Sequence, residues 1–291
     1  MNFIDPLINR KKKLTDVVQF YKKIPLPSVI EISESGTCNR KCSFCPRSSP
    51  DFRDIKEFIS INLLKKLVKE LGRLNYSGIF LFSGFVEPLL DKNIFSLIEI
   101  TRKYLPKAKI EMVTNGDVLN ATRIKKLYQA GLSTLLISIY DSKKDADKME
   151  KLFIDNGINN EKFKIRHRYL KENESFGITL SNRAGMMDNA EYKIPSLLVP
   201  LKKPCYYPHY TFFMDYTGEV LICSHDWGKK LIAGNINFQT FIEIWTGKAF
   251  NDARERLEKG DRNFSPCNKC DVNGILMGQK HKDSWKNKIS L

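Results

Sequence analysis

The sequence predicts an α/β fold: a partial (βα)6-type TIM barrel, followed by a small C-terminal unit made of a β-hairpin and a helix. Short apolar runs alternate with amphipathic segments from residue 28 to residue 170. The apolar runs are hydrophobic nearly throughout, which is typical of parallel strands covered by helices. A closed eight-fold barrel usually needs about 250 residues, so five or six βα units in an open barrel fit better.

The elements of the barrel can be assigned in order along the chain. Amphipathic helices are expected where apolar residues recur at helical spacing, as Leu63, Leu67 and Leu71 do. The strands are expected at residues 28–33, 78–84, 109–116, 132–142 and 161–170, and the helices at 62–74, 92–105, 120–131 and 143–157.

The pattern changes after residue 175. A loop-rich stretch is followed by a predicted hairpin at residues 211–223, with Gly218 at its turn, and then by one helix near 238–260. The sequence therefore predicts an N-terminal helical cap or linker (1–27), a barrel (28–199) and a small second unit (200–291).

Composition limits the class of protein. A hydrophobic content of 42% and a mean hydropathy of −0.35 are ordinary for a globular protein, and no apolar run approaches the roughly 20 residues of a membrane span. The N-terminus lacks the apolar stretch of a secretory signal, so we expect a cytoplasmic protein. The net charge of +15 is spread along the chain, which indicates a solvated surface and disfavours a nucleic-acid partner.

Seven cysteines in a reducing compartment favour metal binding or catalysis over disulfides, and an odd number cannot pair completely. Cys38, Cys42 and Cys45 lie within eight positions, just after the first predicted strand. A structural zinc ion normally has four ligands. Three thiolates can instead hold an iron–sulfur cluster and leave one iron with an open position.

The remaining four cysteines are spaced for a closed site. Cys223 ends the predicted hairpin, and Cys267 and Cys270 form a Cys-x2-Cys knuckle, with Cys205 as the fourth thiol. Spacing alone is compatible with either a zinc ion or a fully ligated [4Fe–4S] cluster.

The motif Cys38-x3-Cys42-x2-Cys45, with Phe44 before the third cysteine, resembles the signature of radical S-adenosylmethionine (SAM) enzymes. The resemblance implies that the open iron binds SAM, and that one electron cleaves SAM to methionine and a 5′-deoxyadenosyl radical that abstracts hydrogen. It also implies a set of SAM contacts, namely Phe44, Gly84, Glu87, Asn115, Ser138 and one of Arg166 and Arg168.

One of these motifs departs from the family. The segment Gly84–Glu87 resembles a Gly-Gly-Glu strand end, but Phe85 and Val86 stand between its glycine and its glutamate. A requirement for positive φ at Val86 would be costly.

The later cysteines resemble the twitch form of the SPASM domain, which implies a second [4Fe–4S] cluster. The stretch SNRAG at 181–185 is similar to aminocyclitol dehydrogenases of the family, which implies that Arg183 holds a polar substrate. His225, two residues past Cys223, is the candidate base for removing a hydroxyl proton.

These features predict an oxidoreductase that dehydrogenates a sugar, cyclitol or other polyol, with a flavodoxin- or ferredoxin-type protein as reductant. A redox-neutral epimerase is the nearest alternative, and it would need a hydrogen donor such as Tyr206 or Tyr207. Three further hypotheses are an enzyme that modifies a ribosomal peptide, a scaffold without catalysis and a zinc-ribbon nucleic-acid-binding protein.

Metal analysis separates several of these hypotheses. We expect about eight irons and a matching amount of acid-labile sulfide per chain after anaerobic reconstitution, four for each cubane. About four irons with one zinc would remove the electron acceptor and favour a redox-neutral reaction. A colourless protein with zinc alone would favour the zinc-ribbon hypothesis.

Overall fold

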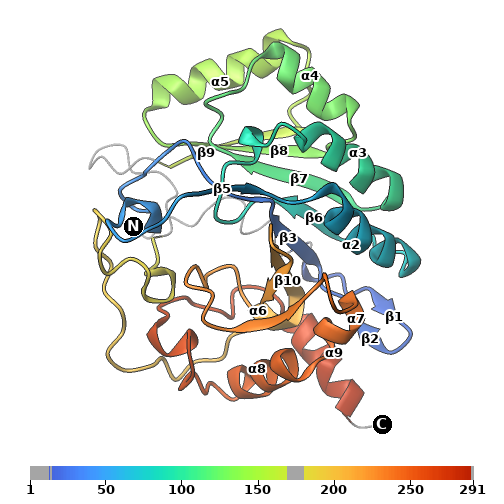
Figure 1. The fold of residues 1–291 in the computed structure, drawn as a ribbon, viewed down its shortest axis with the longest axis vertical. Coiled ribbons are helices and arrows are strands. Elements are labelled where there is room, and N and C mark those ends of the chain that lie inside the picture. Colours follow the sequence, from blue (N-terminus) through green and yellow to red (C-terminus); the bar gives the residue numbers. More distant parts are fainter. Residues whose placement is uncertain (1–12, 14, 169–179, 290–291) are drawn as a thin grey trace.

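The computed structural model describes residues 13, 15–168 and 180–289, and its centre is a mixed eight-stranded sheet (Figure 1). The strand order is β12-β11-β10-β3-β6-β7-β8-β9. Neighbours from β10 to β9 in this order are parallel, which confirms the predicted α/β partial barrel. The parallel strands are β3 (Val29–Ser33), β6 (Ile79–Phe82), β7 (Lys109–Thr114), β8 (Thr134–Ile139), β9 (Phe163–His167) and β10 (Thr211–Asp215).

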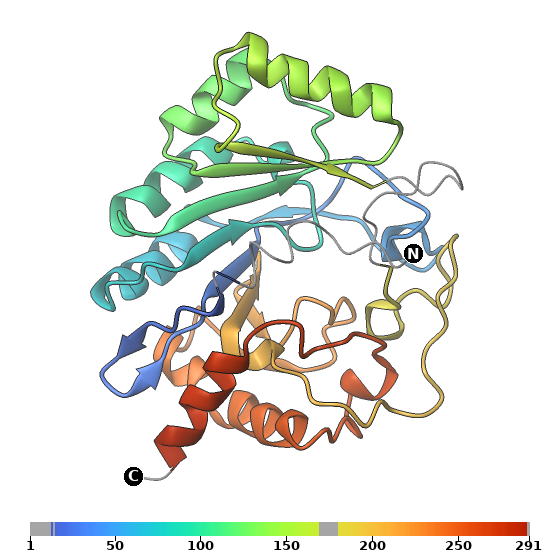
Figure 2. The same ribbon diagram turned by 180° about the vertical axis from the view of Figure 1, so that it is seen from behind.

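Four helices cover the outer face of this sheet: α2 (Ile61–Arg73), α3 (Ile94–Tyr104), α4 (Ala121–Gln129) and α5 (Lys143–Asp155) (Figures 1 and 2). The side chain of Ser60 caps α2 by accepting a hydrogen bond from Leu63 N, and Asn120 and Ser142 cap α4 and α5 in the same way. In the described part of the chain no helix is long and apolar enough to span a bilayer.

The C-terminal hairpin is continuous with the barrel sheet. Strand β10 pairs with β3 in parallel, from Thr211 opposite Val29 to Asp215 opposite Ser33. Strand β11 (Glu219–Leu221) returns antiparallel to β10, and β12 (Ile232–Asn235) pairs with β11. The sixth parallel strand therefore comes from the hairpin, whereas residues 29–167 supply five.

The structure differs from expectation near both ends. The expected C-terminal helix is broken into α7 (Phe241–Trp245) and α8 (Lys248–Glu258) at Gly247, where a Cβ would lie 2.7 Å from Glu243 O. Most of the expected basic N-terminal helix lies outside the described residues. The rest of that cap forms a small β-hairpin, β1 (Phe20–Tyr21) with β2 (Ile24–Pro25).

Several elements were not predicted from the sequence. Strands β4 (Ser35–Gly36) and β5 (Ile55–Phe58) pair at the two ends of the cysteine-bearing loop. The others are strand β12, the one-turn helix α6 (Tyr207–Tyr210) before β10, helix α9 (Gln279–Ile289) and the short 3-10 turns η1 (Pro46–Ser48), η2 (Pro88–Leu90), η3 (Arg183–Gly185) and η4 (Cys267–Lys269).

The joint between hairpin and barrel can be tested at Phe212, which is fully buried and packs against Phe241, with ring centroids 4.8 Å apart. We expect Phe212→Ala to lower the free energy of unfolding by about 3–5 kcal/mol, because it leaves a cavity beside β10. Anaerobic urea unfolding followed by circular dichroism measures this loss. The control is Phe238→Ala, since Phe238 is 86% exposed and should change stability little. Equal effects of the two substitutions would contradict this account.

Candidate active site

The three clustered cysteines lie on the loop between β4 and β5. The loop is turned by a hydrogen bond from Cys45 N to Cys42 O (2.9 Å), and Arg40 N donates to Cys38 Sγ (3.4 Å). Because β4 and β5 pair with each other, both ends of the loop are fixed beside the end of β3.

Arg47 anchors this loop to the barrel. Its guanidinium is buried and donates to Phe85 O through Nε (3.0 Å) and Nη2 (2.6 Å), and to Gly36 O (3.0 Å). It also pairs with Asp54, whose carboxylate accepts hydrogen bonds from Thr37 Oγ1 (2.7 Å) and Cys38 N (3.4 Å). Sequence reasoning missed Arg47 and Asp54, although an arginine two residues past the last clustered cysteine was a usable signal.

A hollow of about 160 Å³ opens beside the three cysteines. Its walls come from the cysteine loop, the ends of β6 and β7, and the segments that carry Arg183 and Trp227. The predicted site residues that line it are Cys38, Cys42, Phe44, Cys45, Gly84, Glu87, Asn115 and Arg183.

In the segment Gly84–Glu87, which follows β6, one described residue has a left-handed backbone conformation. Gly84 has φ +98°, and a Cβ there would lie 2.9 Å from Ser33 Cβ, whereas Phe85 and Val86 keep negative φ. The replaced glycine therefore causes no backbone strain. The Phe85 ring instead packs against Trp227 (centroids 4.5 Å apart) and Phe213 (4.8 Å), which makes an aromatic wall.

Glu87 links the ends of β6 and β7. Its carboxylate is 2% exposed and accepts hydrogen bonds from Leu89 N (3.1 Å), Thr114 Oγ1 (2.6 Å) and Asn115 N (2.7 Å). Burial raises the pKa of Glu87, and these hydrogen bonds oppose that shift. With three donors already bound, the carboxylate keeps little capacity for a ligand, so its contact with SAM stays a prediction.

Asn115 and Arg40 hold the cysteine loop against the ends of β7 and β8. Asn115 Nδ2 donates to Asn39 Oδ1 (2.8 Å), and the Arg40 guanidinium pairs with Asp117 and Asp141. Sequence reasoning did not single out Arg40 or its two acidic partners, because Asp117 and Asp141 lie 77 and 101 residues away from Arg40 in the chain.

The remaining predicted SAM contacts lie on β8 and at β9. Ser138 is buried opposite Arg166 in the parallel register, and Arg166 Nη1 donates to its hydroxyl (3.4 Å). Arg168 follows β9, and its backbone N–H donates to Ile139 O (2.9 Å). These three residues are not among those that line the hollow.

Both cysteine sets have the character of iron–sulfur ligands. All seven thiols are free of disulfides. Burial, and to a smaller extent repulsion from Cys45, raises the pKa of Cys42 to about 12. Burial also raises the pKa of Cys223, and the charges of Cys205 and Cys270 raise it further. Buried thiolates packed together are costly unless a metal neutralises them.

The geometry also bears on which metal group fits. Among the described residues, no three Cys, His, Asp or Glu side chains converge as the ligands of one metal ion must. Each thiolate of a cubane binds its own iron at a corner of the cluster, so the four sulfurs stand farther apart than the ligands of a single metal ion. The close approach of Gly274, where a Cβ would lie 2.2 Å from Cys205 Sγ, shows how tightly the second set is enclosed.

Arg183 and His225 connect the two cysteine sets. Burial raises the pKa of Cys45, and the Arg183 guanidinium lies near enough to oppose part of that rise. Arg183 Nη1 is 3.4 Å from His225 Nδ1, and His225 N donates to Cys223 Sγ (3.4 Å). A guanidinium can only donate, so this contact favours the tautomer in which Nδ1 accepts and Nε2, which faces Tyr207 Oη at 3.4 Å, carries the ring proton.

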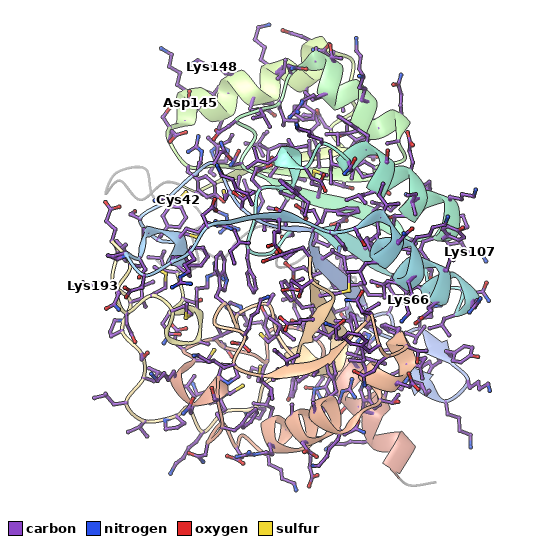
Figure 3. The ribbon with its side chains drawn as sticks, in the orientation of Figure 1. Cys42, Lys66, Lys107, Asp145, Lys148 and Lys193 are labelled. Atoms are coloured by element: carbon purple, nitrogen blue, oxygen red, sulfur yellow. The ribbon has the colours of Figure 1, made fainter. Side chains whose placement is uncertain are left out.

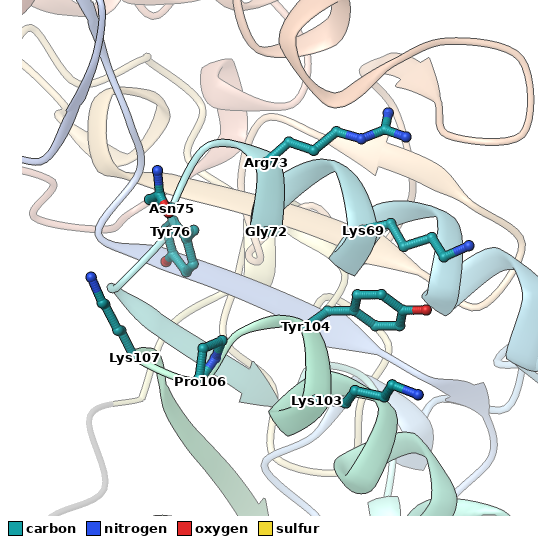
Figure 4. A pocket seen from close by; sticks show the side chains of 9 residues that line it. All are labelled: Lys69, Gly72, Arg73, Asn75, Tyr76, Lys103, Tyr104, Pro106 and Lys107. Carbon is teal, nitrogen blue, oxygen red and sulfur yellow. The ribbon is translucent and has the colours of Figure 1, made fainter.

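A larger hollow of about 510 Å³ lies elsewhere, between the C-terminal ends of α2 and α3 (Figure 4). Figure 3 shows Cys42 at the other end of the sheet from Lys107, which lines this hollow. Among the described residues that line it there is no Cys, His, Asp or Glu, and Arg73 and Lys103 lie in last helical turns, where cations complement the helix carbonyls. It is therefore separate from the cysteine chemistry.

Comparison with known proteins gives this architecture a class. Residues 32–187 match the Radical SAM superfamily, and residues 205–271 match SPASM, described as an iron–sulfur cluster-binding domain. The chain belongs to the Radical SAM superfamily. It is a SAM-dependent oxidoreductase whose cofactors are SAM and two [4Fe–4S] clusters, as predicted.

Two relatives are informative. The S-adenosyl-L-methionine-dependent 2-deoxy-scyllo-inosamine dehydrogenase of Niallia circulans is 29% identical over 84% of this chain and 92% of its own length. The GTP 3′,8-cyclase of Aquifex aeolicus is 29% identical over 38% of this chain and 35% of its own length.

Solved structures agree with the sequence relatives. The crystal structure of BtrN in complex with AdoMet and 2-DOIA matches with a TM-score of 0.74 and 27% identity, over 89% of this chain and 98% of that one. Native anSMEcpe with bound AdoMet, at a TM-score of 0.54 and 15% identity over 90% of this chain and 96% of that one, shows the shared fold.

The anchor at Arg47 can be tested by substitution. We expect Arg47→Ala to lose the cluster of the first site, because Phe85 O and Gly36 O lose their donor and the cysteine loop is freed. A buried group left without its hydrogen bond costs about 1–3 kcal/mol. Iron should fall from about eight to about four per chain, and 5′-deoxyadenosine formation should stop. The control is Arg53→Ala, whose side chain is exposed on the same loop; full iron content in both variants would refute the anchor.

Proposed function

We propose that the protein dehydrogenates a hydroxyl-bearing carbon of an aminocyclitol or a similar polyol. The observation that carries this proposal is the Arg183–His225 pair, which lies between the two cysteine sets. When bound, SAM with the first cluster would supply hydrogen-atom abstraction, and the second cluster would supply a one-electron acceptor. The residues of the chain must then bind the substrate, orient it and remove the hydroxyl proton.

Arg183 is the substrate-binding group in this proposal. Its side chain lines the hollow beside Cys38, Cys42 and Cys45, and a guanidinium can donate several hydrogen bonds to hydroxyl oxygens. The donor arrangement suits a polyol, whose oxygens are all acceptors.

His225 accepts the hydroxyl proton. Its Nδ1 is an acceptor whose present contacts, with Ser181 Oγ and Arg183 Nη1, are both 3.4 Å long. A substrate hydroxyl that forms a shorter hydrogen bond can displace them. The Tyr207 hydroxyl on the other side of the ring keeps the Nε2 tautomer, so that Nδ1 stays ready for the proton.

The aromatic wall of the hollow limits access of water to the reacting carbon. Phe85 and Trp227 pack together on one side, and Phe44 packs against Tyr140 (centroids 5.3 Å apart) on another. An apolar lining with a few polar groups fixes the orientation of a small ligand.

The relatives support the substrate class. One is named as a 2-deoxy-scyllo-inosamine dehydrogenase, and BtrN was solved with AdoMet and 2-DOIA.

The electron for the first cluster would come from a flavodoxin- or ferredoxin-type protein in the cytoplasm. A net charge of +15 favours association with such an acidic protein.

Epimerisation is the second candidate, because Tyr207 lies close enough to His225 to exchange a proton with it. An epimerase must return a hydrogen atom to the substrate carbon. With all seven cysteines assigned to the two cluster sites, another donor, such as Tyr206 or Tyr207, would be needed.

The reaction can be tested with 2-deoxy-scyllo-inosamine deuterated at its carbinol carbons. We expect deuterium in 5′-deoxyadenosine and, from unlabelled substrate, a product two mass units lighter, both by mass spectrometry. Substitution His225→Gln should lower the rate of oxidation by about 10²–10⁴-fold, the usual effect of losing a general base. Solvent deuterium at a product carbon with no mass loss would instead establish the epimerase.

A further inference from the structure

Asn182 joins the segment that carries Arg183 to the cysteine knuckle of the second cluster site. It is completely buried, and its backbone N–H donates to both carboxylate oxygens of Asp271 (3.1 and 3.0 Å). Its side chain accepts from Asp271 N (3.4 Å) and donates to Lys269 O (2.6 Å) and Pro195 O (3.2 Å). Lys269 and Asp271 flank Cys270, so most of these bonds end on the knuckle.

The segment that follows Asn182 has a backbone that needs restraint from outside. Arg183 (φ +47°) and Ala184 (φ +54°) are left-handed, and Gly185 (φ +94°) continues the turn. Residues with a side chain rarely adopt this conformation, and they keep it only where the surroundings impose it.

Packing at Gly185 supplies a second restraint from the knuckle. A Cβ at this position would lie 2.7 Å from Ser196 Oγ and 3.0 Å from Lys269 Cδ. The same loop reaches the first site, where Tyr192 N donates to Ser43 O (2.9 Å). The segment therefore contacts both cysteine regions.

The knuckle itself has little structure of its own. Turn η4 has three residues, and its own backbone bonds are all local: Asn268 N donates to Phe264 O (2.9 Å), Lys269 N to Pro266 O (3.3 Å) and Cys270 N to Cys267 O (3.2 Å). A cluster bound by Cys267 and Cys270 would fix this short segment further, as in other sites where metal binding and folding are coupled.

We propose that Asn182 and Asp271 are positioning residues that make the placement of Arg183 depend on an assembled second cluster. The catalytic part of this inference rests on the proposed function. Substrate then binds productively only when the electron acceptor is in place. An enzyme that lacks the second cluster is kept from starting a hydrogen abstraction that it cannot complete.

The structural part is tested by hydrogen exchange, without any substrate. In Asp271→Ala we expect the amide protection of residues 181–187 to fall by about 10–100-fold, because hydrogen bonds to a charged group are lost. The double variant Cys267→Ala, Cys270→Ala should expose the same segment while the first cluster keeps about four irons. The control is Asp261→Ala. The Asp261 carboxylate accepts hydrogen bonds from Arg256 and Asn263 in the same unit, and it does not touch residues 181–187. Unchanged protection in Asp271→Ala or in the cysteine variant would overturn the proposal.

The functional part uses the KM for 2-deoxy-scyllo-inosamine and the ratio of product to 5′-deoxyadenosine. In Asp271→Ala with a full complement of iron, we expect the KM to rise about ten-fold or more and the ratio to fall, with SAM affinity unchanged. Asp271→Asn, which keeps one acceptor, should recover part of both. Lost protection with unchanged KM and ratio would overturn the coupling. If the wild-type chain does not oxidise this substrate, the proposed function fails at that point. The exchange experiment still decides whether Asp271 and the second cluster hold the segment that carries Arg183.

Discussion

The parallel pairing of β10 with β3 is the constraint on which the rest of the structure depends. It adds the C-terminal hairpin to the barrel sheet, with β10 beside the strand that leads into the first three cysteines. Cys38 follows the end of β3, whereas Cys205 precedes the start of β10 and Cys223 lies just past β11. The two cysteine sets are thereby held on either side of a short space that Arg183 and His225 occupy. All seven cysteines are free of disulfides, so the distance between these regions is set by strand register and by the aromatic core around Phe212.

Charge inside the site is arranged around the thiolates. Two cysteine sets bring negative charge into a buried region, and Arg47, Arg40 and Arg183 lie beside the first of them with different tasks. Arg47 fastens the first loop to the end of β6, Arg40 fastens it to β7 and β8 through acidic partners, and Arg183 faces the hollow. The first two guanidinium groups are satisfied by protein acceptors. The contacts of Arg183 are longer, at 3.4 Å to His225, which suits a group that must also bind a substrate.

The site residues differ in how far they could be predicted from the sequence. The cysteines and Gly84 were predictable, because their chemistry or their backbone conformation is local. Phe85 was noted as a departure, but its packing against Trp227 crosses from the barrel to the hairpin and could not be foreseen. Arg40 and Asn182 were missed because their partners are remote in the chain, 77 residues away for Asp117 and 89 for Asp271, and the remote partner of Arg47 is Phe85, 38 residues away. An arginine or asparagine in a loop gives no sign of such a partner.

The sequence by itself determined the alternation of strands and helices, the two cysteine sets and the class of chemistry. The alternation rests on periodicity and the two cysteine sets on spacing, which are local, whereas the class of chemistry follows from the resemblance of these motifs to a known family. Tertiary structure alone decided that the sixth parallel strand comes from the hairpin, that the expected C-terminal helix breaks at Gly247, and that Glu87 binds the neighbouring strand end with its carboxylate. The strand pairing and the Glu87 bonds depend on contacts between segments that only folding brings together, whereas the break at Gly247 depends on the local turn at Glu243–Gly247. The energy of such a contact is a property of the pair, and neither partner's own sequence encodes it.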